Sequence, residues 1–565
     1  MIPSERYSSL GEFLEDAFIQ FKTETALIEA NRKRESVRYT YREMHQQVLR
    51  VAAWMQAQGV GPESRVAIAM SNQSRWLIGA TAALLRGAIL VPIDYKLEGK
   101  EQLALQAHAK PALLLTEYSE WRKMGLDSPA SQVLLSEAPE GMEIGAAIRW
   151  EGLEEESFEP APKPVRVDRR REDIACIVYS SGTGGTPKGC MLSHGAYLEQ
   201  YRSLTTLFPM TIGDRYFSIL PTNHAIDFMC GYIGPLASGA TIVHQRALRP
   251  ELLAHTMKRY GITHMAVVPL ILEAFERRLR EKLEQATGAR QAIFGGLRWL
   301  NAALTLDKPR RGLSKQLLGP IHEAFGGELK MLFSGGAFVD ADRARFFYEL
   351  GIPVVIGYGL TEACTVLTVN AIAPFRGDSV GAPLPGVELE IRDADPTSNV
   401  GEVWAKSPTL MSGYLDEPEQ SEEVLVEGWL RTGDLGYVDP SGHLHLVGRS
   451  KNMIVTPGGK NIYPEDIEGA FEGLPCEELA VFAAGYVWPG VELTEERLFA
   501  VVREGRRGLR EELRRRNRRL PDFKRIEGLL VWDEPFPRTA SMKVKRALLA
   551  EQLRAQVARD RVEGI

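Results

Sequence analysis

Two spacings of apolar residues alternate along the first 360 positions, and together they predict alternating strands and helices. Short runs rich in Val, Ile and Leu predict buried strands. Apolar positions three or four residues apart, such as Met44, Val48, Val51 and Met55, predict helices that pack one face on a core. The predicted strands lie at 26–28, 65–70, 89–92, 174–179, 216–221, 241–243, 264–269, near 332 and at 353–356. This order predicts an α/β fold, with a large N-terminal layered domain and a largely parallel sheet.

The length and one change of composition refine this picture. A chain of 565 residues is too long for one ordinary core and predicts at least two domains. Between 136 and 171 the sequence becomes rich in Glu, Pro and Gly, which predicts an exposed connection. The apolar run 76–93 is interrupted by Arg86 and Gly87, so a buried helix followed by a strand is favoured over a membrane span.

Composition excludes several functional classes. Apolar residues make up 44% and charged residues 25%, as in soluble globular proteins, and the net charge of −6 gives no indication of nucleic-acid binding. The five cysteines are odd in number and widely spaced, which favours a reducing compartment over a disulfide framework or metal cluster. The N-terminus lacks the basic and then apolar order of a signal peptide, so a cytoplasmic location is expected.

The most informative segment is 179–189, Tyr-Ser-Ser-Gly-Thr-Gly-Gly-Thr-Pro-Lys-Gly. Its four glycines let backbone N–H groups approach an anion, and its four hydroxyls and one lysine supply further donors. A predicted strand precedes it, and Ser193 is a suitable cap for a helix beginning near His194. The segment therefore predicts a phosphate-binding loop.

Two familiar phosphate loops do not match this segment. Pro187 stands where a Walker loop has its second glycine, and also where the dinucleotide fingerprint has its third. The segment instead resembles the phosphate loop of the adenylate-forming (ANL) superfamily, which includes AMP-forming acyl-CoA synthetases; Gly184 replaces the usual second threonine. The resemblance implies ATP contacts from Ser180, Ser181, Gly182, Thr183, Gly185, Thr186 and Lys188.

Two further segments resemble nucleotide-binding motifs of the superfamily. Gly335, Gly336 and Ala337 form a glycine turn after a strand, which the resemblance places along the adenine. The segment 358–362, Tyr-Gly-Leu-Thr-Glu, resembles Tyr-Gly-x-Thr-Glu. The resemblance implies that Tyr358 and Gly359 contact adenine, that Thr361 contacts the α-phosphate and that Glu362 binds Mg²⁺, which prefers oxygen ligands.

The later motifs imply a mobile C-terminal domain. The segment 429–434 matches Trp-x-x-Thr-Gly-Asp, so Asp434 and Arg449 are expected to bind the ribose, and Lys451 falls at the family's hinge. The expected domains are therefore 1–449 and a small α+β domain, 450–565. By resemblance, Gly458 and Gly459 line a pantetheine tunnel. Lys543 falls on the lysine that acts in adenylation, although Met542 replaces a glycine beside it and Lys545 is the alternative.

The acid-binding residues are predicted less directly. His224 follows a predicted strand where the superfamily lines its carboxylate pocket, and Gly357 is a second candidate; an ordinary loop histidine explains His224 equally well. The basic amphipathic region 277–316 resembles an insert of long-chain members. Packing of this insert on the domain is favoured, and a peripheral membrane contact stays open. The nine arginines within 503–519 indicate a solvated face.

Together these motifs imply an AMP-forming acyl-CoA synthetase with ATP, Mg²⁺ and coenzyme A as cofactor and cosubstrates. We expect a medium- or long-chain fatty acid as substrate, most like the long-chain fatty acid CoA ligases. Three alternatives remain: a fatty acyl-AMP ligase that loads a carrier protein, a non-catalytic nucleotide- or acyl-binding homologue, and an amino-acid adenylation domain using Asp227. The sequence leaves the oligomeric state open between monomer and homodimer.

Overall fold

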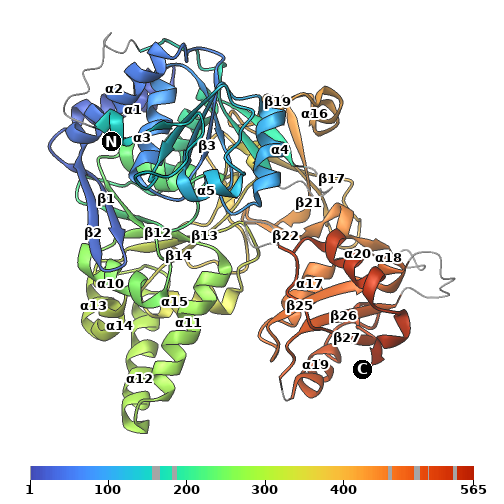
Figure 1. Ribbon diagram of the computed structural model, residues 1–565. Coiled ribbons are helices and arrows are strands. Elements are labelled where there is room, and N and C mark those ends of the chain that lie inside the picture. The colour runs from blue at the N-terminus through green and yellow to red at the C-terminus, as the bar shows by residue number, and fades with distance from the viewer. Residues whose placement is uncertain are drawn as a thin grey trace. The chain divides into compact units, whose positions relative to one another are not determined.

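The chain packs into two compact units (Figure 1). The computed structural model describes residues 2–154, 166–180, 187–455, 461–488, 497–506, 508–538 and 544–565. The first unit comprises the described residues of 2–180, Pro187–Glu388 and Lys406–Leu430; the second comprises Leu389–Ala405 and the described residues of Arg431–Ile565. The large α/β unit and the smaller C-terminal unit confirm the predicted fold class. A hinge near Lys451 stays a prediction, because the division into compact units describes how residues pack and does not show that one unit rotates.

A nine-stranded sheet forms one half of the first unit, in the order β16-β15-β14-β13-β12-β10-β11-β1-β2. Neighbouring strands from β1 to β14 run parallel, and β2, β15 and β16 pair antiparallel at the two edges. The strands are β1 (Thr25–Asn31), β2 (Arg34–Thr40), β10 (Arg215–Ser218), β11 (Thr241–Gln245), β12 (His264–Val267), β13 (Met331–Ser334), β14 (Val354–Tyr358), β15 (Thr368–Val369) and β16 (Ala382–Pro383).

An eight-stranded sheet forms the other half, in the order β19-β9-β8-β4-β3-β5-β6-β7. It is parallel from β8 to β7, and β9 joins β8 and β19 antiparallel. The strands are β3 (Arg65–Ala69), β4 (Ile89–Pro92), β5 (Leu113–Glu117), β6 (Gln132–Ser136), β7 (Ile148–Arg149), β8 (Ile174–Ser180), β9 (Lys188–Ser193) and β19 (Gly413–Tyr414).

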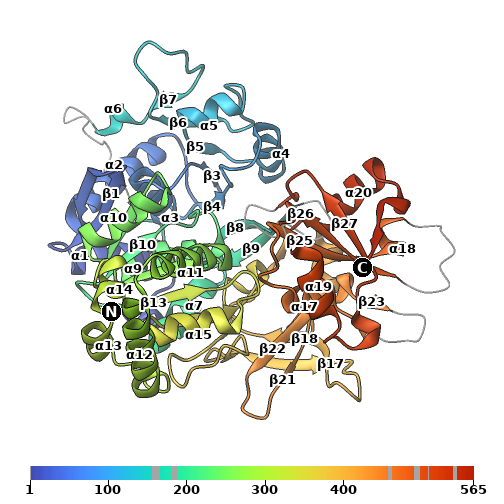
Figure 2. The ribbon, with the colours of Figure 1, turned by 90° about the horizontal axis from the view of Figure 1, so that it is seen from below.

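Helices cover both faces of both sheets. Alternate strand residues point to opposite sides, and both sets are apolar, so each face needs a covering layer. Val66 and Ile68 face the core shared with the other sheet, whereas Ala67 and Ala69 face the outer layer. Figures 1 and 2 show α10, α11 and α15 on the side of the nine-stranded sheet away from α1–α3. The inner helices are α1 (Leu10–Gln20), α2 (Tyr41–Ala57), α3 (Ser74–Leu85), α7 (His194–Leu207) and α9 (Gly234–Ala237); the outer ones are α4 (Gly99–Ala109), α5 (Tyr118–Lys123), α10 (Pro250–Tyr260), α11 (Pro269–Glu284), α12 (Gly288–Thr305), α13 (Arg311–Leu317), α14 (Gly319–Ala324) and α15 (Ala341–Glu349).

The described part of the second unit contains two main sheets, besides the two-stranded pair of β23 (Ile454–Val455) and β24 (Asn461–Ile462). In one, β21 (Trp429–Val438) pairs antiparallel with β22 (Leu444–Arg449), and β17 (Glu388–Arg392) and β18 (Gly401–Lys406) extend the sheet. The other has the order β25-β26-β27-β28 and separate apolar clusters on its two faces. The strands of this sheet are β25 (Glu478–Ala483), β26 (Leu498–Arg503), β27 (Gly528–Trp532) and β28 (Glu563–Gly564). The helices of the same part of the chain are α17 (Pro464–Ala470), α18 (Ala484–Val487), α19 (Leu509–Asn517) and α20 (Arg546–Gln556).

Two expectations from the sequence need correction. The stretch 136–171 is not simply an exposed connection, because it contains β7 and α6 (Glu151–Glu154) and buries Trp150 to 1% exposure against α3. The strand expected at 216–221 ends at Ser218, after which the chain turns. Among the described residues, no helix combines the length and apolar content that crossing a bilayer requires.

Candidate active site

The two strands that flank the phosphate loop form a β-hairpin. β8 pairs antiparallel with β9, and Ser180 lies directly opposite Lys188. The helix predicted after the loop is confirmed: α7 begins at His194, and the Ser193 hydroxyl accepts a hydrogen bond from the Ala196 N–H at 3.1 Å. The sequence missed β9, which separates the loop from this helix. Ser181, Gly182, Thr183, Gly185 and Thr186 lie outside the described residues.

One tyrosine connects a candidate phosphate ligand with the candidate metal ligand. The Lys188 ammonium lies 4.9 Å from the centre of the Tyr414 ring, a cation–π distance. The Tyr414 hydroxyl donates a hydrogen bond to Glu362 Oε1 at 3.1 Å. Tyr414 is only 7% exposed, and its strand β19 pairs with β9. The structure therefore brings Lys188 and Glu362 to one ring, although they are far apart in the sequence.

A tight turn after β14 presents Thr361 and Glu362. Gly359 is required there, because a Cβ at this position would lie 1.8 Å from the Thr365 carbonyl oxygen. The short 3-10 helix η3 (Thr361–Ala363) follows, and the Met411 N–H donates to the Glu362 carbonyl at 2.8 Å. The Met411 bond thus fixes the Glu362 backbone, while the Tyr414 hydroxyl contacts its carboxylate.

The predicted adenine turn lies beside this segment. β13 and β14 are parallel neighbours, with Ser334 opposite Ile356, so their carboxyl ends meet at one edge of the sheet. A Cβ on Gly335 would lie 2.8 Å from the Gly357 carbonyl oxygen, which requires glycine for this close approach. Gly336 has a φ of +81°, and Tyr358 is 8% exposed. The structure therefore brings Gly335, Gly336 and Ala337 together with Tyr358.

The turn that carries His224 is fixed by hydrogen bonds to two other segments. Asn72 donates from Nδ2 to the Leu220 carbonyl at 2.6 Å and accepts from the Thr222 N–H at 2.9 Å. The Thr365 hydroxyl donates to the Ala225 carbonyl at 3.1 Å, which ties this turn to the loop after Glu362. The His224 turn therefore lies next to the predicted nucleotide loop.

His224 itself faces a carboxylate. Its Nε2 lies 3.4 Å from Asp94 Oδ2, and 27% of its side chain is exposed. Burial lowers the pKa of His224, and the nearby charge of Asp94 raises it by a smaller amount. The histidine is therefore neutral near pH 7, a state in which a ring N–H can still donate to a carboxylate substrate.

Asp227 does not provide an accessible charge for a substrate amine. It is fully buried, and it accepts hydrogen bonds from the hydroxyls of Ser218 at 2.7 Å and Thr222 at 3.1 Å. Burial raises the pKa of Asp227 to about 7. A buried carboxyl group of this kind stabilises the loop around it through hydrogen bonds. This argues against an amino-acid adenylation domain in which Asp227 would bind the substrate amine.

The two expected ribose ligands lie opposite each other in the second unit. Asp434 on β21 pairs with Arg449 on β22, and Arg449 Nε lies 2.6 Å from Asp434 Oδ1. The Thr432 hydroxyl accepts from the Asp434 N–H at 3.1 Å. Lys451 is exposed in the 3-10 helix η4 (Ser450–Asn452). Gly458, Gly459 and Lys543 lie outside the described residues.

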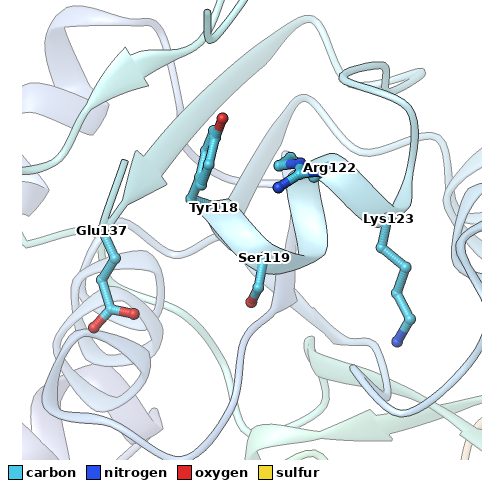
Figure 3. A pocket seen from close by; sticks show the side chains of 5 residues that line it. All are labelled: Tyr118, Ser119, Arg122, Lys123 and Glu137. Carbon is cyan, nitrogen blue, oxygen red and sulfur yellow. The ribbon is translucent and has the colours of Figure 1, made fainter. Parts of the chain in front are cut away.

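One surface hollow contains none of the predicted residues. It measures about 560 Å³ and is lined by Tyr118, Ser119, Arg122, Lys123 and Glu137 (Figure 3). These residues belong to α5 or directly follow β6 in the eight-stranded sheet. Two of them are already engaged, since Lys123 donates to the Tyr95 carbonyl and Glu137 accepts from Arg246. The hollow therefore does not identify an acyl pocket.

Comparisons with known proteins add independent information. The family model described as AMP-binding enzyme matches residues 14–415. A long-chain-fatty-acid–[acyl-carrier-protein] ligase, AEE15, from Arabidopsis thaliana is 26% identical, with 77% of this chain and 69% of that protein covered. A feruloyl-CoA synthase from an Amycolatopsis species is 28% identical, with 78% and 79% covered.

A solved structure is similar over nearly the whole chain. It is the o-succinylbenzoate coenzyme A synthetase MenE from Bacillus subtilis, in complex with ATP and a magnesium ion. The TM-score is 0.73, the sequence identity is 23%, and 95% of this chain and 99% of that chain are covered. At this identity the similarity establishes the fold alone.

Proposed function

Because this chain belongs to the AMP-binding enzyme family, we propose that it is an ATP-dependent acyl-CoA ligase for a medium- or long-chain fatty acid. It is an AMP-forming acid–thiol ligase by class. In the proposed reaction the acid carboxylate attacks the α-phosphorus of ATP, pyrophosphate leaves, and the thiol of CoA then displaces AMP from the acyl-adenylate. Adenylation is needed because a free carboxylate has a poor leaving group.

The observation that carries this proposal is that Lys188 and Glu362 both contact Tyr414, Lys188 through the ring and Glu362 through the hydroxyl. A transferring phosphate group needs cationic donors, and the Lys188 ammonium supplies one at the end of the phosphate loop. Glu362 supplies a carboxylate oxygen, which suits Mg²⁺ bound by one protein carboxylate together with substrate phosphates. The ion, when bound, neutralises phosphate charge. Thr361 is proposed to contact the α-phosphate beside it.

We assign the remaining contacts by resemblance and position. Gly335–Ala337 and Tyr358 lie together and would receive the adenine. Asp434 offers two carboxylate oxygens for the ribose hydroxyls, with Arg449 orienting it at 2.6 Å. His224 would donate to the carboxylate of the acid. Lys543 would act in adenylation, while Lys451 would serve as the hinge and Gly458 and Gly459 would line the path of the CoA arm.

The acid is the least constrained part of the proposal. The insert 277–316 and the segment 458–468 favour a medium- or long-chain acid by resemblance. The relatives described above act on different acids by name, a long-chain fatty acid and ferulate. A cytoplasmic location belongs to the same proposal and rests on the five dispersed cysteines.

A second candidate function is transfer of the acyl group to a carrier protein. The name of the Arabidopsis relative, an acyl-carrier-protein ligase, favours it. A non-catalytic homologue is less favoured, because Lys188, Thr361, Glu362, Asp434 and Arg449 are all present.

The test is acid-dependent pyrophosphate release over acids from acetate to palmitate, with benzoate and ferulate included, each with and without CoA, followed by mass analysis of the products. Release that yields an acyl-CoA from medium or long acids supports the proposal. Release that stops at the acyl-adenylate despite CoA supports the carrier-protein candidate. Glu362→Gln is the matched control, since it removes the charge at equal size; release that persists in it comes from a contaminant.

A further inference from the structure

Helix α12 extends beyond the other elements of the first unit (Figure 1). It follows α11 after a short connection, and Gln291 in the first turns of α12 donates to the Leu283, Glu284 and Ala286 carbonyls and so caps the end of α11. No acidic residue occurs in the 18 residues of α12, and its only charged residues are Arg290 and Arg298. The helix is therefore unusually apolar for one that projects from a protein.

One side of α12 is anchored to the rest of the unit. Asn301 and Thr305 are buried, and Asn301 donates to the Glu349 carbonyl on α15 at 3.0 Å. Arg298 Nε lies 2.6 Å from Glu349 Oε2. Phe294 and Leu297 pack against the outer core of the nine-stranded sheet. These contacts fix which side of the helix faces outward.

The outward side exposes large apolar residues. Ile293 is 63% exposed, Leu300 37% and Leu304 46%. Their spacing of seven and four residues places them in one line along the helix. Trp299, at 72% exposure, lies on a neighbouring flank. Ile293, Trp299, Leu300 and Leu304 are called the α12 patch below, and large apolar side chains exposed together on one short helix mark an interaction surface.

The charge around the α12 patch restricts its partner. Residues 277–316 contain ten Lys or Arg and three Asp or Glu, in a chain whose net charge is −6. Six of the cations are exposed and form no ion pair with another described residue; they are Arg277, Arg278, Lys282, Arg290, Lys308 and Arg310. Arg290 precedes Ile293 by three residues and Lys308 follows Leu304 by four, so the patch has a cation at each end along the chain. An apolar face with cations at its ends complements an anionic bilayer surface, whereas two copies of this region would repel each other.

We propose that the α12 patch binds the surface of anionic lipid membranes, with the apolar side chains entering the interface and the flanking cations contacting lipid headgroups. The packing of the insert on the domain, expected from the sequence, is compatible with this binding, because the anchored and exposed sides of α12 are different. The inference goes beyond the proposed function and does not depend on which acid is activated, since membrane binding is measured without turnover.

The experiment is flotation of the full chain with vesicles of phosphatidylcholine alone and of phosphatidylcholine mixed with phosphatidylglycerol, at low and high salt. We expect binding to the mixed vesicles at low salt and release at high salt. Ile293→Glu with Leu304→Glu should weaken binding at least about tenfold, because two apolar contacts are replaced by charges. Arg290→Glu with Lys308→Glu should weaken it by about fivefold or more per site.

Ile212→Glu is the matched control, because Ile212 is 55% exposed in the same unit and belongs to the connection between α7 and β10, outside the segment 277–316. It should bind as the unchanged protein does, and thermal unfolding should be the same for all variants, since every substituted residue is exposed. Equal binding to neutral and anionic vesicles, an equal loss in the control, or no binding at all would overturn the proposal. So would a change from dimer to monomer in the Ile293→Glu, Leu304→Glu protein with vesicle binding retained, because the patch would then join two copies.

Discussion

At the scale of single residues, Tyr414 is predicted to orient Glu362 through its hydroxyl. Tyr414→Phe removes the 3.1 Å hydrogen bond to Glu362 and keeps the ring beside Lys188. Since a bond to a charged group is lost, we expect a rise of about tenfold in the KM for magnesium–ATP in the pyrophosphate-release assay. Tyr348→Phe is the control, because its hydroxyl donates to the Ile372 carbonyl at 3.1 Å away from the site. Equal kinetics of the two variants would show that the Glu362 contact is unimportant.

A second residue-scale prediction concerns the buried carboxyl group of Asp227. Burial raises the pKa of Asp227 from 3.8 to about 7. Between about pH 4 and pH 7 the folded protein therefore keeps this carboxyl group protonated, whereas the unfolded chain has already released the proton. Its contribution to the free energy of unfolding is therefore present at low pH and lost as pH rises to 7. Burial lowers the pKa values of His194 and His264 to about 4, so their contribution to the free energy of unfolding increases as pH rises. A measurement on Asp227 must remove this opposite contribution.

Comparison of Asp227→Asn with the unchanged protein removes the contribution of those histidines, because both proteins contain them. Relative to the unchanged protein, the variant should gain stability from pH 5 to 8, by on the order of 3 kcal/mol, as measured by denaturant unfolding. Asp127→Asn, at an exposed position, should give no such pH-dependent difference. Parallel stability curves for Asp227→Asn and the unchanged protein would contradict a raised pKa.

At the scale of elements, the turn from β14 into η3 depends on one glycine. In Gly359→Ala the new Cβ would meet the Thr365 carbonyl at 1.8 Å, and a backbone atom cannot move aside as a side chain would. We expect a stability loss of about 2 kcal/mol and displacement of Thr361 and Glu362, with a large loss of pyrophosphate release. Gly319→Ala is the control, because its Cβ would meet open space at the start of α14. Normal activity of Gly359→Ala would contradict the assigned role of this turn.

The elements also show what the apolar pattern could and could not predict. Strands such as β3, β4 and β8 were predicted because buried parallel strands are continuous apolar runs. β19 was missed because it has only two residues and exists through pairing with β9, more than 200 positions earlier in the chain. Tyr414 was missed with it. Trp150 was missed because the charged residues around it dominate the local composition, while its burial depends on a distant helix.

At the scale of the whole molecule, length and motif order predicted two units but not the segment Leu389–Ala405. This segment belongs to the second unit although it precedes Lys406–Leu430 of the first. It does so because β17 and β18 join the sheet of β21, a long-range pairing that local sequence cannot show. The motifs in 332–362 were found because tight turns and charged ligands need particular residue types at fixed spacing.

The final prediction separates the two half-reactions of the proposed function. Lys543→Ala should lower acid-dependent pyrophosphate release by about a hundredfold or more, because the cation proposed to stabilise the reacting phosphate is lost. The same variant, given a synthetic acyl-adenylate and CoA, should form the thioester at nearly the original rate. A mutation that merely unfolded the second unit would instead reduce both half-reactions.

Lys545→Ala is the matched control for this experiment, since it removes the same charge two residues later, at the N-cap of α20. The replacement of the usual glycine by Met542 makes the comparison informative, because a different loop path would present Lys545 in place of Lys543. If Lys545→Ala loses adenylation and Lys543→Ala keeps it, the catalytic role belongs to Lys545. If both variants adenylate normally, neither lysine acts on the phosphates. Lys188 would then be the lysine that stabilises the phosphate charge.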